Sequence, residues 1–445
     1  MASFDEDREL QCSNSQCKES ASWCCHDCYD TVLCDKCESW HSVFDGNHQV
    51  HLLADLTSEA IERIRAGVYQ MDFTAGHTIA RGTIEVKSET EALETGSLIV
   101  TTRSGELNHN LVHVQIKPEE NVTVNRYEIL GGKVKVKFMA KVAGQLTAEV
   151  QVNEIHASTR PHPLEVNIKP QEMRITGQFN MEGVNIGTSE IRAIAVNRDN
   201  SKIAVSKVSS HCVQVFTTDG DLLSTYGRRG SAQGQLYHPQ GLAFLNDTDL
   251  VIADCGNHRI CIVNTTTGTL VKTFGNQGNG DGQFRYPYGV HVDDDGNIIV
   301  CDRVNRRVQV FTRTRDGDYQ YQFGLTTQDV LFISDVITHD GRFYVSDDNH
   351  VHVFKKIRNV PTRISTIDGQ GSADGKLKGP WGLAIDNDHH LLVCDNGNNR
   401  VLKFRLDGRF VGKTCDVIKD PTYITVLRDG QLLVSTWGSG VWCVK

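Results

Sequence analysis

The sequence predicts a multidomain, mainly β protein whose C-terminal part is a six-bladed β-propeller. Residues 287–324 alternate as four short strands separated by turn-forming residues. Much of this unit recurs from Pro239 and again from Pro380, and successive units start about 41 to 48 residues apart. Seven of the 14 cysteines cluster between Cys12 and Cys37, and residues 86–169 alternate with a period of two, so two smaller modules precede the propeller.

The cysteine-rich segment 8–55 predicts a zinc module. Three close cysteine pairs and two histidines supply eight ligands, enough for two tetrahedral Zn²⁺ sites. About forty residues cannot build an adequate core alone, so bound metal would supply folding energy. A disulfide-bonded knot is the alternative, and the acidic start MASFDEDREL, which has no secretory signal, argues against it. The predicted ligands are Cys12, Cys17, Cys25, Cys28, Cys34, Cys37, His41 and His48, with Cys24 competing with Cys25 and His51 with His48.

The order of these ligands resembles the B-box zinc finger, in which two ligand sets interleave in a cross-brace. The resemblance implies one zinc held by Cys12, Cys17, Cys34 and Cys37, and another held by Cys25, Cys28, His41 and His48. The spacing departs from the B-box pattern in two places. Four residues rather than two separate the first pair, and five rather than four separate Cys28 from Cys34.

Residues 56–85 are expected to form a short helix and a linker. Thr57 or Ser58 can cap a helix that runs to about Met71, because apolar residues recur there at helical spacing. Four turns are too short for a self-sufficient coiled coil, so packing on neighbouring residues is favoured over oligomerisation.

Residues 86–169 predict an antiparallel β-sandwich. Expected strands cover 98–102, 111–117, 133–138, 145–152 and 162–168. The Gly-x-Val-x-Val-x-Phe strand, Gly144 before the next strand and a Pro-x-Pro approach to the last one resemble a filamin-type immunoglobulin repeat. The resemblance implies a spacer or a strand-addition surface, and the segment contains no catalytic constellation.

Residues 171–445 hold six aligned starts of inner strands. The sixth blade is one strand short, and residues 173–179 are expected to supply its outer strand, because closure of the ring removes exposed sheet edges. The six starts are Ile191-Arg-Ala193, Pro239-Gln-Gly241, Pro287-Tyr-Gly289, Ile333-Ser-Asp335, Pro380-Trp-Gly382 and Pro421-Thr-Tyr423.

Three of the blades carry an Asp-x-x-Asn-x-Arg motif, which begins at Asp254, Asp302 and Asp395. We interpret it as blade construction, since Asp and Asn side chains hold tight turns. With the Pro-x-Gly starts, the motif resembles the NHL repeat over about 270 residues. The order of modules resembles the tripartite-motif NHL proteins, without the RING finger and the long coiled coil.

Charge on the propeller is balanced overall and uneven locally. Residues 171–445 hold 30 basic and 30 acidic residues, so the whole net charge of −9 falls on residues 1–170. The loops that enter the inner strands and join strands two and three collect arginines beside aromatic rings, which suits unpaired RNA. The predicted RNA- or partner-binding residues are Arg228, Arg229, Tyr237, His238, Arg285, Tyr286, Tyr288, Arg303, Arg306 and Trp381.

These observations predict a non-enzymatic, cytoplasmic scaffold whose propeller binds RNA or a protein partner. The family resemblance implies post-transcriptional regulation. A RING-less component of ubiquitin ligation is the main alternative, and an NHL-like lyase is the second, although no histidine pair repeats a ligand spacing. No apolar run approaches 18 residues, so no membrane span is expected, nor is a small-molecule substrate. The only expected cofactor is Zn²⁺, two ions in the finger.

Overall fold

The computed structural model divides the chain into two compact units, Met1–Gln171 and Glu172–Lys445. The structure describes residues 23–25, 31–33, 50–52, 68–75, 78–86, 90–102, 112–130, 133–152, 155–156, 164–181, 191–326, 332–367 and 369–445. Over these ranges the regular secondary structure is almost entirely strand, and they include no helix long and apolar enough to cross a membrane.

The first unit contains two main sheets. One has the order β4-β5-β7-β10-β9, and the other has the order β12-β11-β13-β6 with β8 also paired to β11. A small third sheet is formed by β1 (Trp23–Cys25), β2 (Thr31–Leu33) and β3 (Val50–Leu52). The strands of the main sheets are β4 (Val68–Ala75), β5 (Thr78–Val86), β6 (Thr90–Glu91), β7 (Thr95–Thr102), β8 (Val112–Lys117), β9 (Val122–Leu130), β10 (Lys133–Ala140), β11 (Gly144–Val152), β12 (Ile155–His156) and β13 (Leu164–Lys169).

Strand β10 shows why this segment becomes a sheet with one buried face. Its Val134, Val136 and Phe138 are fully buried, while the lysines between them stay at least partly exposed. Such alternation is the pattern of a strand with one face in the core. Gly96 in β7 makes room for the largest of these side chains, since a Cβ there would lie 2.5 Å from the Phe138 ring. All five strands expected between residues 98 and 168 are present.

The helix and linker expected over residues 56–85 are wrong where the structure describes them. Residues 68–75 form β4 and residues 78–86 form β5, paired antiparallel from Val68 opposite Glu85 to Ala75 opposite Thr78. Strand β5 also pairs with β7, so the hairpin extends an existing sheet. The helical spacing of apolar residues that ends at Met71 is a local signal, and pairing with a distant strand outweighs it. Residues 56–67 lie outside the described ranges.

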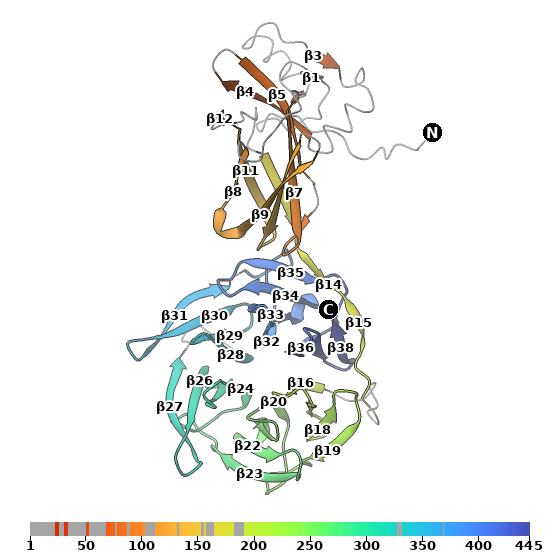
Figure 1. Cartoon of the computed structure of the whole chain (residues 1–445). Coiled ribbons are helices and arrows are strands. Elements are labelled where there is room, and N and C mark those ends of the chain that lie inside the picture. Colours follow the sequence, from red (N-terminus) through yellow and green to blue (C-terminus); the bar gives the residue numbers. More distant parts are fainter. Residues whose placement is uncertain are drawn as a thin grey trace. The chain divides into compact units, whose positions relative to one another are not determined.

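The described residues of the second unit form six sheets, which confirms a six-bladed propeller. Each inner strand lies beside the inner strands of the two neighbouring blades, and the strand of blade 1 contacts that of blade 6, so the ring is closed. Figure 1 shows the inner strands around the centre and the outer strands at the rim. From inner to outer strand, blade 1 is β16 (Ile191–Val196), β17 (Lys202–Lys207), β18 (Cys212–Thr217) and β19 (Leu222–Tyr226); blade 2 is β20 (Pro239–Phe244), β21 (Asp249–Asp254), β22 (Arg259–Asn264) and β23 (Thr269–Phe274); blade 3 is β24 (Pro287–Val292), β25 (Ile298–Asp302), β26 (Arg307–Arg313) and β27 (Tyr319–Thr326). Blade 4 is β28 (Asp335–His339), β29 (Arg342–Ser346), β30 (Val351–Ile357) and β31 (Val360–Ile367); blade 5 is β32 (Pro380–Ile385), β33 (His390–Asp395), β34 (Arg400–Arg405) and β35 (Phe410–Thr414); blade 6 is β36 (Pro421–Val426), β37 (Leu432–Thr436) and β38 (Gly440–Val444).

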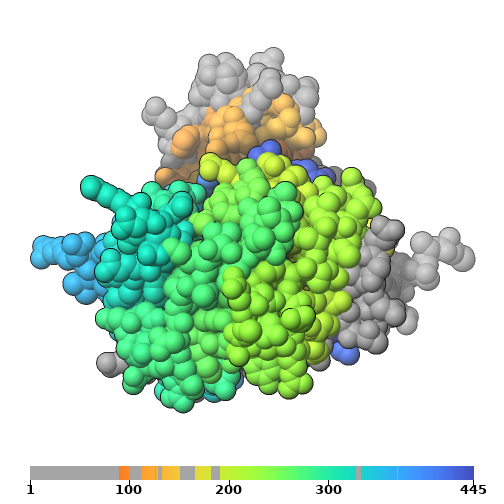
Figure 2. Space-filling model, turned by 90° about the horizontal axis from the view of Figure 1, so that it is seen from below, coloured from red at the N-terminus to blue at the C-terminus, as the bar shows by residue number. Residues whose placement is uncertain are grey.

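The predicted closure of the sixth blade is confirmed. Strand β15 (Ile175–Gln178) pairs antiparallel with β38 and supplies the missing outer strand. Just before it, β14 (Gln171–Met173) adds a fifth strand to the outer edge of blade 5. In Figure 1 the yellow β15 runs along the dark blue β38, although more than 250 residues of chain separate them. Figure 2 shows the colours following one another across the side of the propeller, as expected for blades packed in sequence order.

The glycine of the Pro-x-Gly start is needed where neighbouring inner strands approach each other. A Cβ on Gly241 would lie 2.4 Å from the carbonyl oxygen of Tyr288, and one on Gly382 would lie 2.5 Å from the Cα of Tyr423. Both contacts are with the backbone of the next blade, which cannot move aside cheaply. The motif therefore sets the distance between blades at the propeller axis.

Candidate binding face

The Asp-x-x-Asn-x-Arg motif ties two loops of each blade together. In blade 3 the fully buried Asp302 accepts the backbone N–H of Arg285 at 2.7 Å through Oδ1. Its Oδ2 accepts Nδ2 of Asn305 at 2.8 Å and Nε of Arg307 at 2.9 Å. The turn between strands two and three is thereby joined to the segment that enters the inner strand. The predicted structural role of the motif is confirmed.

The same network is present in blades 2 and 5, centred on Asp254 and Asp395. The guanidinium groups of the motif also donate to backbone carbonyls of the entering loop, for example Arg307 to the carbonyls of Gly280 and Gln283. The side chains of Arg259, Arg307 and Arg400 are only 18, 13 and 12% exposed. These arginines hold the loops together and offer little to a ligand.

Two predicted site residues, His238 and Tyr286, precede the prolines of β20 and β24 in the left-handed conformation, with φ of 53° and 58°. Each backbone N–H is donated to the Nδ1 of a histidine in the preceding blade, at 3.1 Å: His211 for His238 and His258 for Tyr286. The rings of each pair meet edge to face at 4.6 Å. Burial first, then nearby positive charge, lowers the pKa of both accepting histidines, which favours the neutral form that the bond requires.

The middle residues of the six inner-strand starts form a ring around the propeller axis, which we call the axial ring. Its central feature is the buried Arg192, whose guanidinium carbon lies 4.2 Å from the ring centre of Trp381 and 4.0 Å from that of Trp437. The Nε of Arg192 donates to Oε1 of Gln240 at 3.1 Å. Tyr288 meets Trp381 edge to face at 6.4 Å. The axial ring consists of Arg192, Gln240, Tyr288, Ser334, Trp381 and Thr422, and Trp437 packs against it.

A second arginine extends the axial ring outward. The guanidinium of Arg303 lies 4.5 Å from the ring centre of Tyr288 and 5.3 Å from that of Phe332. It also donates to the Oγ of Ser334 at 3.1 Å, so it is fixed by both rings and a hydrogen bond. Phe332 and Trp437 remain 45 and 38% exposed. The face thus presents ordered cations together with accessible aromatic surface.

The structure brings the predicted residues together in two groups. Tyr288, Arg303 and Trp381 belong to or touch the axial ring, and the exposed Arg285 and Arg306 flank them on the neighbouring loops of blade 3. The second group gathers where blades 1 and 2 meet, where Arg229 lies 5.6 Å from the Tyr237 ring and Tyr237 packs on His238. This second group also includes the exposed Arg228, and Tyr286 occupies the corresponding position between blades 2 and 3.

Among the cationic and aromatic residues at the axis, Arg192, Phe332 and Trp437 were not predicted. Arg192 had a usable signal, since it occupies the middle position of an aligned strand start, beside Tyr288 and Trp381 in the same column. Phe332 and Trp437 lie outside the repeated motif, so only the fold brings them to the axis.

The third residues of the six inner-strand starts directly follow the axial-ring residues in sequence. Four are alanine or glycine, but blades 4 and 6 place Asp335 and Tyr423 there. They contribute to a cavity of about 340 Å³ that is lined further on by His291. Burial raises the pKa of Asp335 to about 8, although its Oδ2 accepts the backbone N–H of Leu383 at 3.0 Å. Burial lowers the pKa of His291 to about 4.

The predicted zinc ligands Cys12, Cys17, Cys28, Cys34, Cys37, His41 and His48 lie outside the described residues. Cys25 falls in β1, opposite Val50 of β3, and its alternative Cys24 falls opposite His51. This register describes backbone pairing only, so zinc binding stays a prediction.

Comparison with known families shows that NHL repeats are present. The NHL repeat model matches residues 236–263, 284–311 and 377–404, which belong to blades 2, 3 and 5. These three segments carry the complete Asp-x-x-Asn-x-Arg motif.

Several curated proteins are similar over short stretches. Protein lin-41 of Caenorhabditis elegans is 44% identical over 50 residues, 11% of this chain and 4% of that protein. Protein wech of Drosophila melanogaster is 42% identical over 53 residues, 12% of this chain and 6% of that protein. E3 ubiquitin-protein ligase TRIM71 of Xenopus tropicalis is 42% identical over 45 residues, 10% of this chain and 6% of that protein. The matched stretches span only 4 to 6% of the length of these relatives.

Among solved structures, virginiamycin B lyase from Staphylococcus aureus is similar at 15% identity, with a TM-score of 0.43 over 60% of this chain and 83% of that one. A gluconolactonase from Xanthomonas campestris is similar at 14% identity, with a TM-score of 0.45 over 62% of this chain and 94% of that one.

Proposed function

We propose that the propeller is a non-enzymatic platform that binds unpaired RNA on the axial ring and the arginine-rich loops around it. The observation that carries the proposal is the placement of Arg192 between Trp381 and Trp437, with Arg303 over Tyr288 beside them. The buried Arg192 orders the rings, and the exposed Arg285 and Arg306 supply cations that the phosphates of a strand can reach. Proteins that bind single strands combine such cations with accessible aromatic rings.

The chemistry of single-stranded RNA fits this surface in two ways. Its bases expose their flat faces, and stacking of a base on an aromatic side chain contributes about 1–3 kcal/mol. Its phosphates pair with guanidinium groups, which offer several donors in a fixed plane. Trp437 and Phe332 keep part of their rings accessible for stacking, and Arg285 and Arg306 are exposed for phosphates. A duplex would hide its base faces and leave the rings unused.

The test is a binding titration of the full chain with a random single-stranded RNA pool, followed by fluorescence anisotropy at several salt concentrations. Single-strand binding weakens with salt by a slope of roughly 0.7 per neutralised phosphate. The variant Arg285→Glu/Arg303→Glu/Arg306→Glu should bind more weakly and lose about two units of that slope, roughly 0.7 for each of its cations.

Two controls keep this test specific. Arg303 also bonds to Ser334, so Arg285→Glu/Arg306→Glu separates loss of phosphate contacts from disturbance of the axial ring. Arg313→Glu/Arg315→Glu is charge-matched to that double variant and changes two exposed arginines, at the end of β26 and on the turn after it, on the opposite face. It should bind as the wild type does. Equal binding by Arg285→Glu/Arg306→Glu and this control would refute the assignment of the site.

A protein ligand on the same face is the second candidate, in the role of substrate binding for ubiquitin ligation. It is favoured by the similarity to proteins named E3 ubiquitin-protein ligase TRIM71. Absence of RNA binding, together with loss of a protein partner in the triple variant, would select it. For residues 8–55 we retain the proposal of two zinc ions, supported by the ligand set in the sequence.

A further inference from the structure

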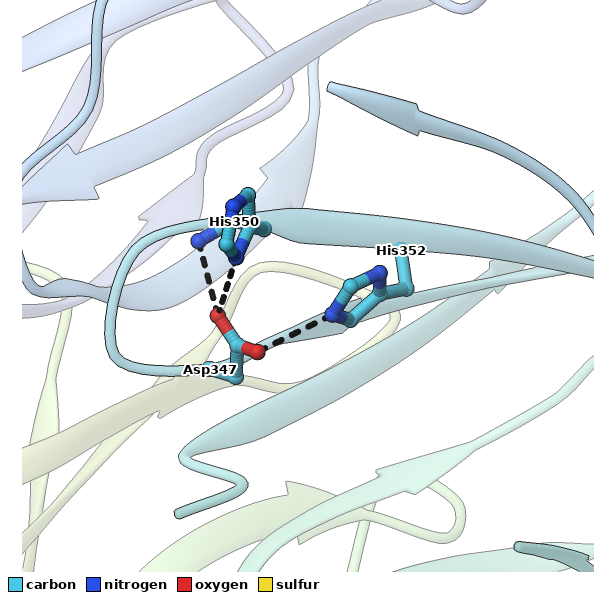
Figure 3. Close-up of side chains that lie close together, drawn as sticks. All are labelled: Asp347, His350 and His352. Atoms are coloured by element: carbon cyan, nitrogen blue, oxygen red, sulfur yellow. Dashed lines mark hydrogen bonds and ion pairs between the residues drawn. The ribbon is translucent and has the colours of Figure 1, made fainter. Parts of the chain in front are cut away.

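Blade 4 replaces the Asp-x-x-Asn-x-Arg network with an aspartate and two histidines. Figure 3 shows Asp347 at the turn between β29 and β30, with His350 and His352 directed toward its carboxylate. Nε2 of His352 lies 2.9 Å from Oδ2 of Asp347, and Nδ1 of His350 lies 3.3 Å from Oδ1. This turn belongs to the same class of loops as the arginine motifs of blades 2, 3 and 5.

The strand register gives the equivalence between the blades. In blade 3, Asp302 pairs with Arg307 across the turn, and Gln309 follows two residues later. In blade 4, Ser346 pairs with Val351 and Val345 with His352, and the backbone N–H of Asp347 bonds to the carbonyl of His350. His350 therefore occupies the place of the motif arginine, and His352 the place of Gln309.

This exchange changes how the buried charge is neutralised. Asp302 and Asp347 are both buried, at 0 and 5% exposed. The guanidinium that faces Asp302 is replaced in blade 4 by two imidazole rings, and imidazole is a common metal ligand. A bound cation would neutralise the buried carboxylate of Asp347, as the guanidinium does in blade 3.

We propose that Asp347, His350 and His352 bind a divalent transition-metal ion of the zinc class, at a site separate from the cysteine-rich segment. One ligand atom from each residue lies within 4.8 Å of the other two. The imidazole nitrogens of His352 and His350 lie 2.9 and 3.3 Å from different oxygens of the carboxylate. These separations are comparable with the about 3.4 Å between two ligands that each lie about 2.1 Å from a tetrahedral metal. Two imidazoles and one carboxylate are a donor set that suits zinc and leaves a fourth position for water.

Two further contacts fit a metal site. The other ring nitrogen of His352, Nδ1, lies 3.2 Å from the Oγ1 of Thr366, in the place of the outer hydrogen bond that orients a metal-bound imidazole. The His350 side chain is 36% exposed, so an ion can reach the site from solvent.

The test measures metal content of the full chain after chelation and return of Zn²⁺. The variant His350→Arg/His352→Gln restores the Asp–Arg–Gln arrangement of blade 3 in the same register, so it neutralises Asp347 without metal and should fold. Wild type is expected to hold one Zn²⁺ more than this variant. With Co²⁺ in place of Zn²⁺, the difference spectrum should lack the sulfur-to-cobalt charge-transfer band of cysteine sites. Thr366→Val should weaken binding at this site roughly 10- to 100-fold.

The control is His113→Gln, which removes an exposed histidine of β8 in the first unit and should leave the zinc content unchanged. Equal zinc content in wild type and His350→Arg/His352→Gln would overturn the proposal. So would a difference spectrum that carries the thiolate band, because the lost ion would then belong to cysteines. These outcomes are independent of RNA binding.

Discussion

Replacing Asp302 with alanine should destabilise the propeller more than most single substitutions. The carboxylate is fully buried and accepts four donors: the backbone N–H of Arg285, and the side chains of Asn305, Arg307 and Gln309, at 2.7 to 3.2 Å. Burial raises the pKa of Asp302 in spite of these donors, so the intact pair contributes little net stability. Its loss is costly for another reason, because Arg307 would remain buried, charged and without its carboxylate.

The expected loss of stability follows from leaving the Arg307 charge without its partner. Removing one partner of a buried ion pair costs about 3–5 kcal/mol. For a unit of this size each kcal/mol lowers the melting temperature by about 2–4 °C, so Asp302→Ala should lower it by roughly 6 to 20 °C. The assay is thermal and urea unfolding of the full chain, followed by tryptophan fluorescence, since Trp381, Trp437 and Trp442 report on the propeller.

Two further variants show how large the effect of Asp302→Ala is by comparison. Asp302→Asn keeps the shape and one acceptor but turns an amide N–H₂ toward the donors of Asn305 or Arg307, so its effect should be intermediate. Asp316→Ala removes an exposed aspartate from a turn of the same blade and should stay within about 0.5 kcal/mol of wild type. A loss below about 1 kcal/mol for Asp302→Ala would refute the account of the motif as the tie between the two loops.

Two further predictions concern the axis. Gly289→Ala would place a Cβ 2.5 Å from Oδ1 and 2.7 Å from the Cα of Asp335. It should lower the free energy of unfolding in urea by about 1–3 kcal/mol. In the control Gly177→Ala the Cβ has open space around it, so the cost should be under about 1 kcal/mol. The pKa of Asp335 is raised from 3.8 to about 8, so wild-type stability should decline as pH rises from about 4 to about 8. Asp335→Asn should remove about 2–5 kcal/mol of that decline, and parallel pH profiles of the two proteins would contradict it.

The propeller was predictable because its signal is repeated. The Pro-x-Gly start recurs in blades 2, 3 and 5, where its glycine permits the close backbone approach between neighbouring inner strands. The closing strand was also predictable, since a sixth blade that lacks one strand leaves an exposed edge. The fold of the first unit was harder to predict from sequence. Whether residues 68–86 form a helix or a hairpin depends on pairing between β5 and β7, which no local pattern within the segment shows.

The candidate site was predicted in part at its centre, where Tyr288 and Trp381 lie, but its central Arg192 was missed for a physical reason. Tyr286, Arg285 and Arg306 stand on loops, where charged and aromatic residues are conspicuous. Arg192 sits within an otherwise apolar strand start, Ile191-Arg-Ala193, where a single arginine has no obvious partner in sequence. Its partners come from blades 2, 3, 5 and 6, so the cost of burying the Arg192 charge is offset only when the ring closes.

The same comparison of equivalent positions explains both proposals. At the middle position of the inner strands, the six blades share one backbone environment but carry different side chains, and the differences make a cation–aromatic cluster at the axis. At the position after the motif aspartate, blade 3 carries Arg307 and blade 4 carries His350, while the carboxylate stays buried in both. Where the blades share one backbone geometry, a side chain that differs from the repeat is not needed to form the blade. Those departures are therefore where binding chemistry should be sought in this chain.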